Sequence, residues 1–225
     1  MPTYRLKSFN IPGFGHELIT PRPAPEVPFS LEEIQDSAPK NPHYMKQVHG
    51  GTVHLVSKKD RNPFPIGTFG DGIITDIPRT PLMVFTADCI PLIIASAKPR
   101  FIGVIHASWR STVVGIIENT LRLLKEEYSS SPSDIHCVMG PCILGEDYEV
   151  GPEVAWRFPN SIREKSGCKY LLDLPAEVIS RLTHLGVPSE NILPPPLSTF
   201  REKWLPSYRR DGDTAERIET VVWLE

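Results

Sequence analysis

The sequence has no long apolar run and no excess of charge of either sign. Every apolar stretch stays below the roughly 18 residues that a membrane-spanning helix requires. Pro12, Gly13 and Gly15 interrupt the N-terminal segment before the apolar core of a signal peptide can form. With 24 basic and 27 acidic residues, the net charge of -3 offers no basic surface to nucleic acid or anionic lipid. We therefore expect a protein with no nucleic acid and no membrane among its partners.

Cysteine is scarce, and the common nucleotide-binding glycine motifs are absent. The four cysteines form no C-x-x-C pair, and a chain of 225 residues can bury a core without disulfides. This usage is typical of a reducing compartment, so we expect a cytoplasmic protein. Neither G-x-G-x-x-G nor G-x-x-x-x-G-K-[ST] occurs, which argues against Rossmann and P-loop nucleotide binding.

Proline, by contrast, is abundant. The chain contains 24 prolines, which gather in residues 21–42 and 194–196. Because proline cannot donate a backbone hydrogen bond, these stretches are expected to be loops. We therefore expect residues 1–45 to be irregular, 46–186 to be densely structured, and 187–225 to form a tail with one final strand. The whole chain, residues 1–225, is expected to be a single domain.

Short apolar and β-branched runs predict a series of strands. These runs occupy residues 52–56, 72–75, 82–86, 92–95, 101–106, 135–139 and 220–224. A turn signal at residues 98–100 predicts that two of them form a hairpin at the centre of a sheet.

Helical periodicity appears mainly after these strands. It predicts a long helix that starts near Ser111 or Thr112 and a short one at residues 153–158. A third helix is expected to begin after Asp173 as N-cap and to end before Gly186. Strands in a row, with helices after them, favour an α+β fold in which helices flank a mixed β-sheet, and they argue against a doubly wound fold.

Three short polar motifs stand inside strongly apolar segments. The motifs KQVHG, TADC and HASWR supply His49, Cys89 and His106 respectively. Two imidazoles and one thiolate form a three-ligand set with an open fourth position, as in catalytic zinc sites. The same side chains could instead form a cysteine–histidine nucleophile pair. Taken singly, each residue also has a purely structural interpretation. His49 would be a surface histidine in a turn, Cys89 a buried apolar thiol, and His106 a histidine at a strand-to-helix junction.

Charged residues beside these motifs are further candidates. Asp88 lies next to Cys89 in an apolar stretch, where we expect its carboxylate to pair, for example with the far nitrogen of a ligand histidine. Asp71 lies between two glycines and is either a turn former or a general base. Arg110 lies at an expected helix start, where free backbone amides attract anions. The adjacent residues Arg209 and Arg210 either bind phosphate or belong to a charged turn, and the local sequence favours the turn.

The order of these motifs resembles one known family. It is similar to the multicopper polyphenol oxidase, or laccase-like, proteins, which are also described as purine nucleoside phosphorylases and peptidoglycan-editing factors. Each motif is weak alone, but the ordered set over residues 46–225 is specific. The matching stretches are residues 47–50, 71–75, 86–91, 106–107, 109–110, 140–141, 148–151 and 207–211.

The resemblance implies a fold and a set of site residues. The fold is an α+β laccase-like domain, of the type shared with necrotizing-factor-like cysteine hydrolases, with residues 1–45 as a divergent, proline-rich part. The metal is zinc rather than copper, and its ligands are His49, Cys89 and His106. On this basis we expect catalytic roles for Cys89 and Asp71, and substrate contacts for the three residues Arg110, Gln47 and Arg22.

The resemblance also implies an activity. The implied reactions are phosphorolysis of adenosine and inosine, cleavage of methylthioadenosine and deamination of adenosine, with purine nucleoside and phosphate as small-molecule partners of a monomer or weak homo-oligomer. Laccase activity fits poorly, because the sequence lacks the many histidines of a multicopper cluster. Two alternatives are a metal-free hydrolase of amides or peptidoglycan precursors, with Cys89 as nucleophile and His49 or His106 as base, and a metal-binding protein without catalysis.

Several positions depart from the family pattern. Ser108 and Ser111 stand where the family usually has glycine, and we expect the added side chains to narrow the site and weaken turnover. The glycine-rich segment expected near Arg22 carries prolines instead, and residues 214–217 replace a Thr-Gly-Arg sequence. These departures concern substrate contacts, whereas the three metal ligands are intact.

Overall fold

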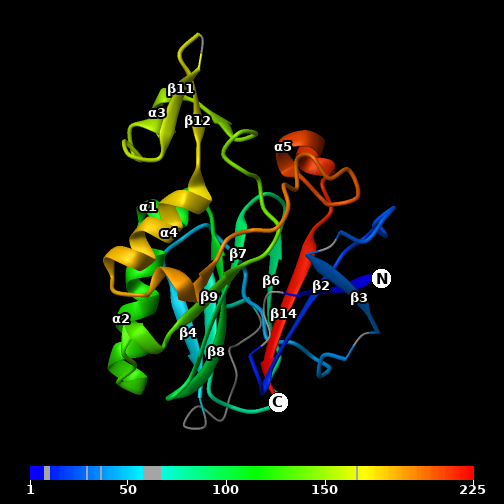
Figure 1. Ribbon diagram of the computed structural model, residues 1–225, viewed down its shortest axis with the longest axis vertical. Helices are drawn as coiled ribbons and strands as arrows, with labels where there is room; N and C mark the ends of the chain where they lie inside the picture. The colour runs from blue at the N-terminus through cyan, green and yellow to red at the C-terminus, as the bar shows by residue number, and fades with distance from the viewer. Residues whose placement is uncertain (8–10, 29, 36, 58–66, 166) are drawn as a thin grey trace.

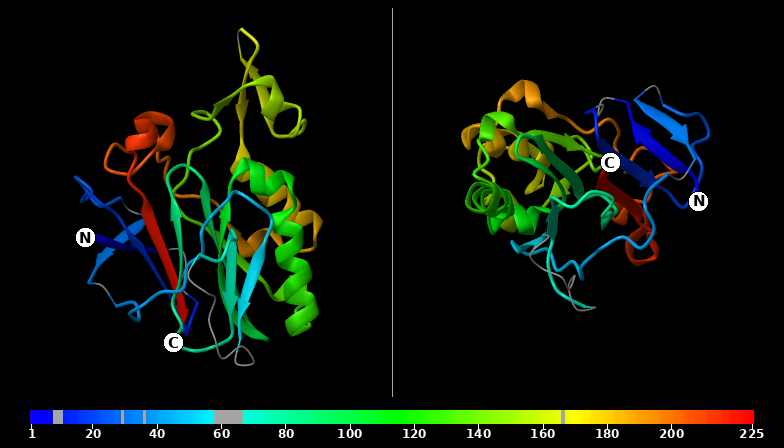
Figure 2. Two further views of the ribbon diagram at one scale, coloured as in Figure 1. Left: turned by 180° about the vertical axis from the view of Figure 1, so that it is seen from behind. Right: turned by 90° about the horizontal axis from the view of Figure 1, so that it is seen from below.

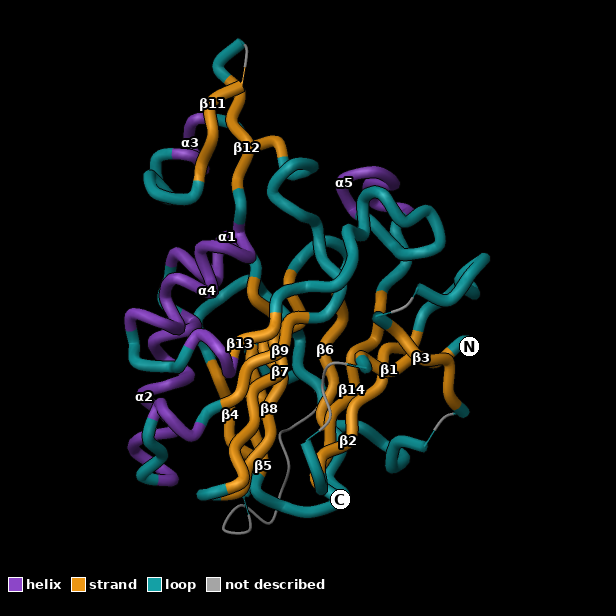
Figure 3. The backbone as a smooth tube through the Cα atoms, viewed as in Figure 1, coloured by secondary structure: helices purple, strands orange, loops and turns teal. Residues whose placement is uncertain are grey.

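Two β-sheets packed face to face, with helices outside one of them, make up most of the structure (Figure 1). The computed structural model describes the whole chain except residues 8–10, 29, 36, 58–66 and 166. Seen from behind and from below, the helical layer lies on one side and the N-terminal strands on the other (Figure 2). Figure 3 shows the same separation of helices from strands. The expected α+β fold is confirmed.

The six-stranded sheet has the order β13-β9-β7-β8-β5-β4. Its parallel pairs are β13 with β9 and β4 with β5, and the other neighbours are antiparallel, so the sheet is mixed as expected. The hairpin of β7 and β8 lies at its centre, and both strands are longer than predicted. The strands are β4 (Val53–Val56), β5 (Gly72–Thr75), β7 (Ile90–Ala97), β8 (Arg100–Ala107), β9 (His136–Met139) and β13 (Ile192–Leu193).

The five-stranded sheet corrects the expectation that residues 1–45 are irregular. Its order is β3-β1-β2-β14-β6, and all its pairs are antiparallel. The prolines of this region lie between the strands rather than within them. Because they are so frequent, the sequence pattern resembled one continuous loop and did not reveal the three short strands. The final strand pairs with β2 on one side and β6 on the other and is therefore internal. The strands are β1 (Thr3–Leu6), β2 (Phe14–Ile19), β3 (Leu31–Ile34), β6 (Leu82–Thr86) and β14 (Ile218–Leu224).

The helix expected to begin at Ser111 or Thr112 is two helices. A short α1 (Trp109–Val113) starts after Ser108, and α2 (Ile116–Tyr128) follows. Gly115 divides them because its φ of 84° lies in the left-handed region that glycine tolerates best. The prediction for α4 (Leu174–His184) is confirmed, since Asp173 accepts the Ala176 N–H at its start and Gly186 has a φ of 96° beyond its end.

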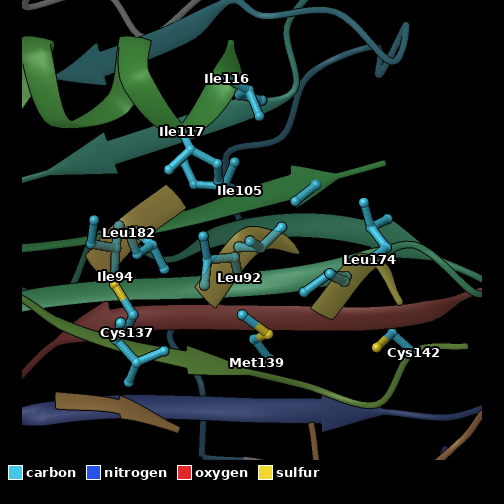
Figure 4. Packing of buried hydrophobic residues seen from close by; sticks show 14 of the residues in the cluster. Leu92, Ile94, Ile105, Ile116, Ile117, Cys137, Met139, Cys142, Leu174 and Leu182 are labelled. Atoms are coloured by element: carbon cyan, nitrogen blue, oxygen red, sulfur yellow. The ribbon is translucent and has the colours of Figure 1, made fainter. Parts of the chain in front are cut away.

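Alternation along the central strands builds two cores. Ile94 and Ile105 face the helices and pack with Ile117 of α2 and Leu182 of α4 (Figure 4). Their neighbours on the opposite face of the six-stranded sheet pack against the five-stranded sheet. Full burial of such side chains stabilises the fold by about 1.5–3 kcal/mol each. The central hairpin is therefore held from both sides.

A small arm extends beyond the ends of the two sheets. Its three-stranded sheet, with the order β10-β12-β11, projects from the top of the molecule in Figure 1, and α5 lies at the same end. The helix predicted at residues 153–158 is shorter than expected. No helix in the described part of the chain is both long and apolar enough to cross a membrane. The remaining elements are β10 (Glu149–Val150), α3 (Pro152–Ala155), β11 (Ile162–Lys165), β12 (Lys169–Leu172), α5 (Tyr208–Asp211), and the 3-10 turns η1 (Pro132–Asp134), η2 (Ser189–Asn191) and η3 (Gly212–Thr214).

Candidate functional site

The structure brings His49, Cys89 and His106 together at one end of the sheets. Their potential ligand atoms all lie within 4.8 Å of one another. The pairing of Ile90 with Ala107 in the central hairpin places Cys89 and His106 side by side, and His49 arrives on the loop before β4. His106 is buried, Cys89 is partly exposed and His49 is exposed. Soft and borderline donors therefore converge where solvent can reach them.

Asp71 fixes the orientation of His106. Its side chain is fully buried, and its Oδ1 lies 2.8 Å from His106 Nδ1. Burial opposes ionisation, but hydrogen bonds from His106 and from the backbone of Gly50 and Val48 hold the pKa of Asp71 below its usual value. The carboxylate therefore accepts the Nδ1 proton, and this leaves Nε2 of His106 as the ligand atom.

The same carboxylate also holds the His49 loop. The backbone N–H groups of Val48, His49 and Gly50 donate to Asp71 at 3.2, 2.9 and 2.7 Å. His49 has a φ of 57°, a conformation that non-glycine residues rarely adopt, and these three bonds stabilise it. One buried aspartate thus positions both histidines of the cluster.

In the metal-free protein, the cysteine and the buried histidine favour opposite charges. Burial alone would raise the pKa of Cys89, but hydrogen bonds with His106 and His49 outweigh it and lower the pKa to about 7. Burial alone would lower the pKa of His106, but hydrogen bonds with Asp71 and Cys89 raise it to about 9. A thiolate beside an imidazolium is a reactive arrangement, and a thiolate is also the form that binds metals.

These residues line a cavity of about 580 Å³. Aromatic rings and guanidinium groups form much of its wall, and Asp88 is its one acidic lining residue among those described. The lining residues are Met45, Gln47, His49, Phe85, Ala87, Asp88, Cys89, His106, Ser108, Trp109, Arg110, Tyr148, Tyr208, Arg209 and Arg217. The cavity is large enough for a small organic molecule.

The three expected substrate contacts have different positions. Arg110 lines the cavity, with its guanidinium 4.5 Å from the centre of the Trp109 ring. Gln47 also lines the cavity, but both ends of its amide bond the backbone of Phe85 at 2.8 Å, which fastens the His49 loop to β6. Arg22 is not among the described lining residues, and its guanidinium pairs with Glu216 at 3.3 Å.

Asp88 does not have the role that its position next to Cys89 suggested. The histidine partner is Asp71, whereas the carboxylate of Asp88 accepts from Thr199 Oγ1 and from the backbone N–H of Arg209, each at 2.6 Å. These donors are 111 and 121 residues away in sequence, so no local pattern could have indicated them. Asp88 instead fastens the C-terminal segment to the wall of the site.

Sequence reasoning also missed several lining residues. Tyr148 and Arg209 both line the cavity, and the Arg209 guanidinium lies 5.3 Å from the centre of the Tyr148 ring. Both belong to motifs that contributed to the family resemblance, yet the local sequence favours a charged turn over phosphate binding for Arg209 and indicates no role for Tyr148. Their occurrence in the family motifs was the signal from which Tyr148 and Arg209 could have been predicted as site residues.

The two departing serines form a helix cap. Ser108 Oγ accepts the Ser111 N–H at 3.1 Å, and Ser111 Oγ accepts the Ser108 N–H at 2.7 Å, which is a reciprocal capping box. Ser108 lines the cavity, whereas Ser111 is fully buried beside it and is not a lining residue. The cap therefore engages the backbone N–H of Ser111 in the first turn of α1.

Comparisons with known proteins show to which proteins this sequence is similar. A family model described as multi-copper polyphenol oxidoreductase laccase matches residues 30–225. The chain is 36% identical over 178 residues to a purine nucleoside phosphorylase of Aquifex aeolicus, covering 79% of this chain and 81% of that protein. It is 33% identical over 186 residues to the purine nucleoside phosphorylase Rv2149c of Mycobacterium tuberculosis, covering 81% and 72%.

Solved structures agree with the sequence comparisons. YlmD from Geobacillus stearothermophilus has a TM-score of 0.77 and 25% identity, covering 95% of this chain and 93% of that one. The hypothetical protein YfiH from Bacillus licheniformis has a TM-score of 0.75 and 26% identity, covering 81% and 73%. The family model, the curated relatives and the solved structures all support the resemblance inferred from the motifs, so this chain belongs to the multi-copper polyphenol oxidoreductase laccase family.

Proposed function

We propose that the chain is a zinc-dependent purine nucleoside phosphorylase. The observation that carries this proposal is the meeting of three metal-donor side chains with aromatic rings and arginines in one cavity. Two curated relatives that are at least 33% identical bear the name purine nucleoside phosphorylase. A purine nucleoside offers a flat base and a polar sugar, and phosphate offers charge, so the cavity lining is complementary to both substrates.

The donor set is suitable for zinc. His49, Cys89 and His106 provide two imidazoles and a thiolate, and the bond that His106 Nδ1 donates to Asp71 is the outer contact typical of a metal-binding histidine. When bound, zinc supplies Lewis-acid polarisation of a substrate oxygen. Copper also accepts these donors, so elemental analysis decides the metal. The described residues contain one such cluster, whereas multicopper oxidation requires several.

The side chains of the cavity wall have separable tasks in phosphorolysis. A phosphate oxygen forms a bond to C1′ of the ribose as the bond from C1′ to the base nitrogen breaks, and the electron pair leaves with the base. We assign phosphate binding to Arg110, whose planar guanidinium matches two phosphate oxygens. We assign base contacts to Trp109 and Tyr148, whose rings line the same cavity.

Asp71 acts in this proposal through His106 rather than on the substrate. Its carboxylate is fully buried, and it accepts bonds from three backbone amides and one imidazole. No substrate atom can reach it without breaking these bonds. We therefore assign Asp71 as a positioning residue, whereas Cys89 and His106 remain the groups that face the cavity.

The test combines metal analysis with turnover. Purified protein is expected to contain about one zinc per chain and to release free base from adenosine, inosine or methylthioadenosine only when phosphate is present. Conversion of adenosine to inosine in the same assay would report deamination. Protein that holds zinc but is inert on all three nucleosides would instead favour a binding protein without catalysis.

A second candidate function is a metal-free cysteine hydrolase. Asp71, His106 and Cys89 form a connected series of acid, imidazole and thiol, and the pKa of Cys89 is lowered to about 7. Such a protein would attack an amide, for example in a peptidoglycan precursor, through the thiolate. Chelator-treated protein that cleaves peptidoglycan fragments, and loses this activity on alkylation of Cys89, would establish this candidate in place of the phosphorylase.

A further inference from the structure

Asp88 connects the C-terminal segment to the site at two points. Its buried carboxylate accepts from Thr199 Oγ1 and from the backbone N–H of Arg209, each at 2.6 Å. Asp88 has a φ of 86°, an uncommon conformation for a residue other than glycine, and the two short bonds help to hold it. The backbone of Arg209 is therefore fixed to the residue that precedes Cys89.

The side chain of Arg209 is held over the cavity wall. Its guanidinium stacks on the Tyr148 ring at 5.3 Å, and Nη1 donates to the backbone carbonyl of Glu149. Arg110 has a similar arrangement on the Trp109 ring at 4.5 Å. Both arginines line the cavity. Each aromatic ring orients a guanidinium plane while leaving most of its N–H groups free.

The two arginines also lack the partners that nearby arginines have. Arg201 pairs with Glu146 and Asp147, and Arg210 pairs with Asp211. In the described part of the chain, neither Arg110 nor Arg209 forms an ion pair with a carboxylate. Stacked guanidiniums without a carboxylate partner beside a cavity are suited to an anion that arrives with the substrates.

We propose that Arg209 is a second phosphate-binding residue and that it forms, together with Arg110, a two-arginine clamp for inorganic phosphate at the wall of this cavity. The inference rests on the proposed function for the identity of the anion. It assigns Asp88 and Thr199 as positioning residues that hold the backbone of Arg209. The rings of Trp109 and Tyr148 orient the two guanidiniums, and these are free to contact one anion from two segments of the chain.

The decisive measurement separates phosphate from nucleoside. We expect Arg209→Gln to raise the KM for phosphate about 10- to 100-fold, as the loss of a charge-assisted hydrogen bond predicts. The KM for inosine should change less than about twofold, and the zinc content should stay the same, because Arg209 is not a metal donor. Arg209→Lys should be intermediate, since lysine keeps the charge but loses the planar fork.

Two further variants serve as controls. Arg122→Gln removes a surface arginine of α2 that pairs with Glu126, outside the cavity, and it should leave both KM values unchanged. Thr199→Val keeps the size of the side chain but removes its bond to Asp88, and it should raise the KM for phosphate less than Arg209→Gln does. A merely structural role of Arg209 would lower the melting temperature and leave the ratio of the two KM values unchanged.

Calorimetric titration with inorganic phosphate distinguishes failure of the clamp from failure of the proposed function. Phosphate binding by the wild type that Arg209→Gln weakens supports the clamp even if no nucleoside is cleaved. Active enzyme whose KM and affinity for phosphate are unaffected by Arg209→Gln overturns the clamp and leaves the phosphorylase proposal intact.

Discussion

His106 Nδ1 and Asp71 Oδ1 lie 2.8 Å apart in a fully buried pair, and the same carboxylate accepts the backbone N–H of His49. A single buried charge therefore orders two of the three metal-donor residues. Because the pair is desolvated, each partner depends on the other, and loss of one leaves the other without compensation. Asp71 thus supports the donor cluster although it is not itself one of the three donors.

Asp71→Asn should weaken metal binding without removing a ligand. The amide is uncharged, so it supports the orientation of His106 and the three backbone amides of the His49 loop less well. Loss of such an outer contact typically lowers metal affinity about 10- to 100-fold. Competition with a chromophoric chelator measures the zinc affinity, and Asp134→Asn, an exposed change in η1, is the control. Equal affinities of wild type and Asp71→Asn would show that the pair does not support the metal site.

Cys89→Ala should remove most of the bound metal. The substitution deletes the only thiolate of the cluster and leaves two imidazoles, which are a poor zinc site. Cys168→Ser is the matched control, because Cys168 is an exposed free thiol outside the cluster. Elemental analysis of both variants after expression in zinc-replete medium gives the answer. A wild type without stoichiometric transition metal would show that the site assignment is wrong.

Arg110→Ala should raise the phosphate requirement and leave the melting temperature nearly unchanged. Its side chain is exposed and stacks on Trp109, so truncation removes an anion contact and little packing. Arg22→Ala should leave the KM for phosphate unchanged, because Arg22 pairs with Glu216 instead of lining the cavity. Steady-state kinetics and thermal melts separate the two roles. A marked loss of stability with unaltered kinetics would assign Arg110 to the fold.

The two serines of the α1 cap should respond differently to glycine. Ser108→Gly removes a side chain from the cavity wall, which enlarges the cavity and should increase turnover. Glycine at an N-cap lowers the stability of the fold by only about a few tenths of a kcal/mol. Ser111→Gly breaks the reciprocal cap inside the helix and should cost about 1–2 kcal/mol without opening the cavity. Denaturant melts and nucleoside turnover are compared for each variant. Faster turnover in Ser111→Gly alone would contradict this division.

His16 should make stability fall with acidification. It is buried, and its Nε2 accepts the Leu6 N–H at 2.9 Å, so it is neutral in the fold. Burial, with the nearby charge of Arg5, lowers its pKa from 6.5 to about 3. Between these two values the unfolded chain binds a proton that the folded chain does not.

The stabilisation from neutral His16 is therefore present above pH 6.5 and is lost as pH falls toward 3, by up to about 1.4 kcal/mol per pH unit. In His16→Gln the amide oxygen can still accept from Leu6 but does not titrate. Urea melts from pH 7 to pH 5 should give a shallower decline for the variant, and parallel curves would exclude this role.

The sequence by itself determined the central hairpin, the α4 boundaries and the three metal-donor candidates. Each follows from a local signal: β-branched runs on both sides of a turn, a capping aspartate with a terminal glycine, or a donor residue inside an apolar segment. Such signals act over a few residues, so they can be identified without knowledge of the fold.

Only the tertiary structure decided which partners the buried carboxylates meet. Asp71 reaches the His106 ring across 35 residues, and Asp88 reaches the backbone N–H of Arg209 across 121, through sheet pairing and loop closure that no local pattern encodes. The N-terminal strands were hidden for the same reason, because β2 is defined by its pairing with the C-terminal strand β14. Strand pairing and buried ion pairs depend on contacts between distant segments, and these contacts exist only once the chain has folded.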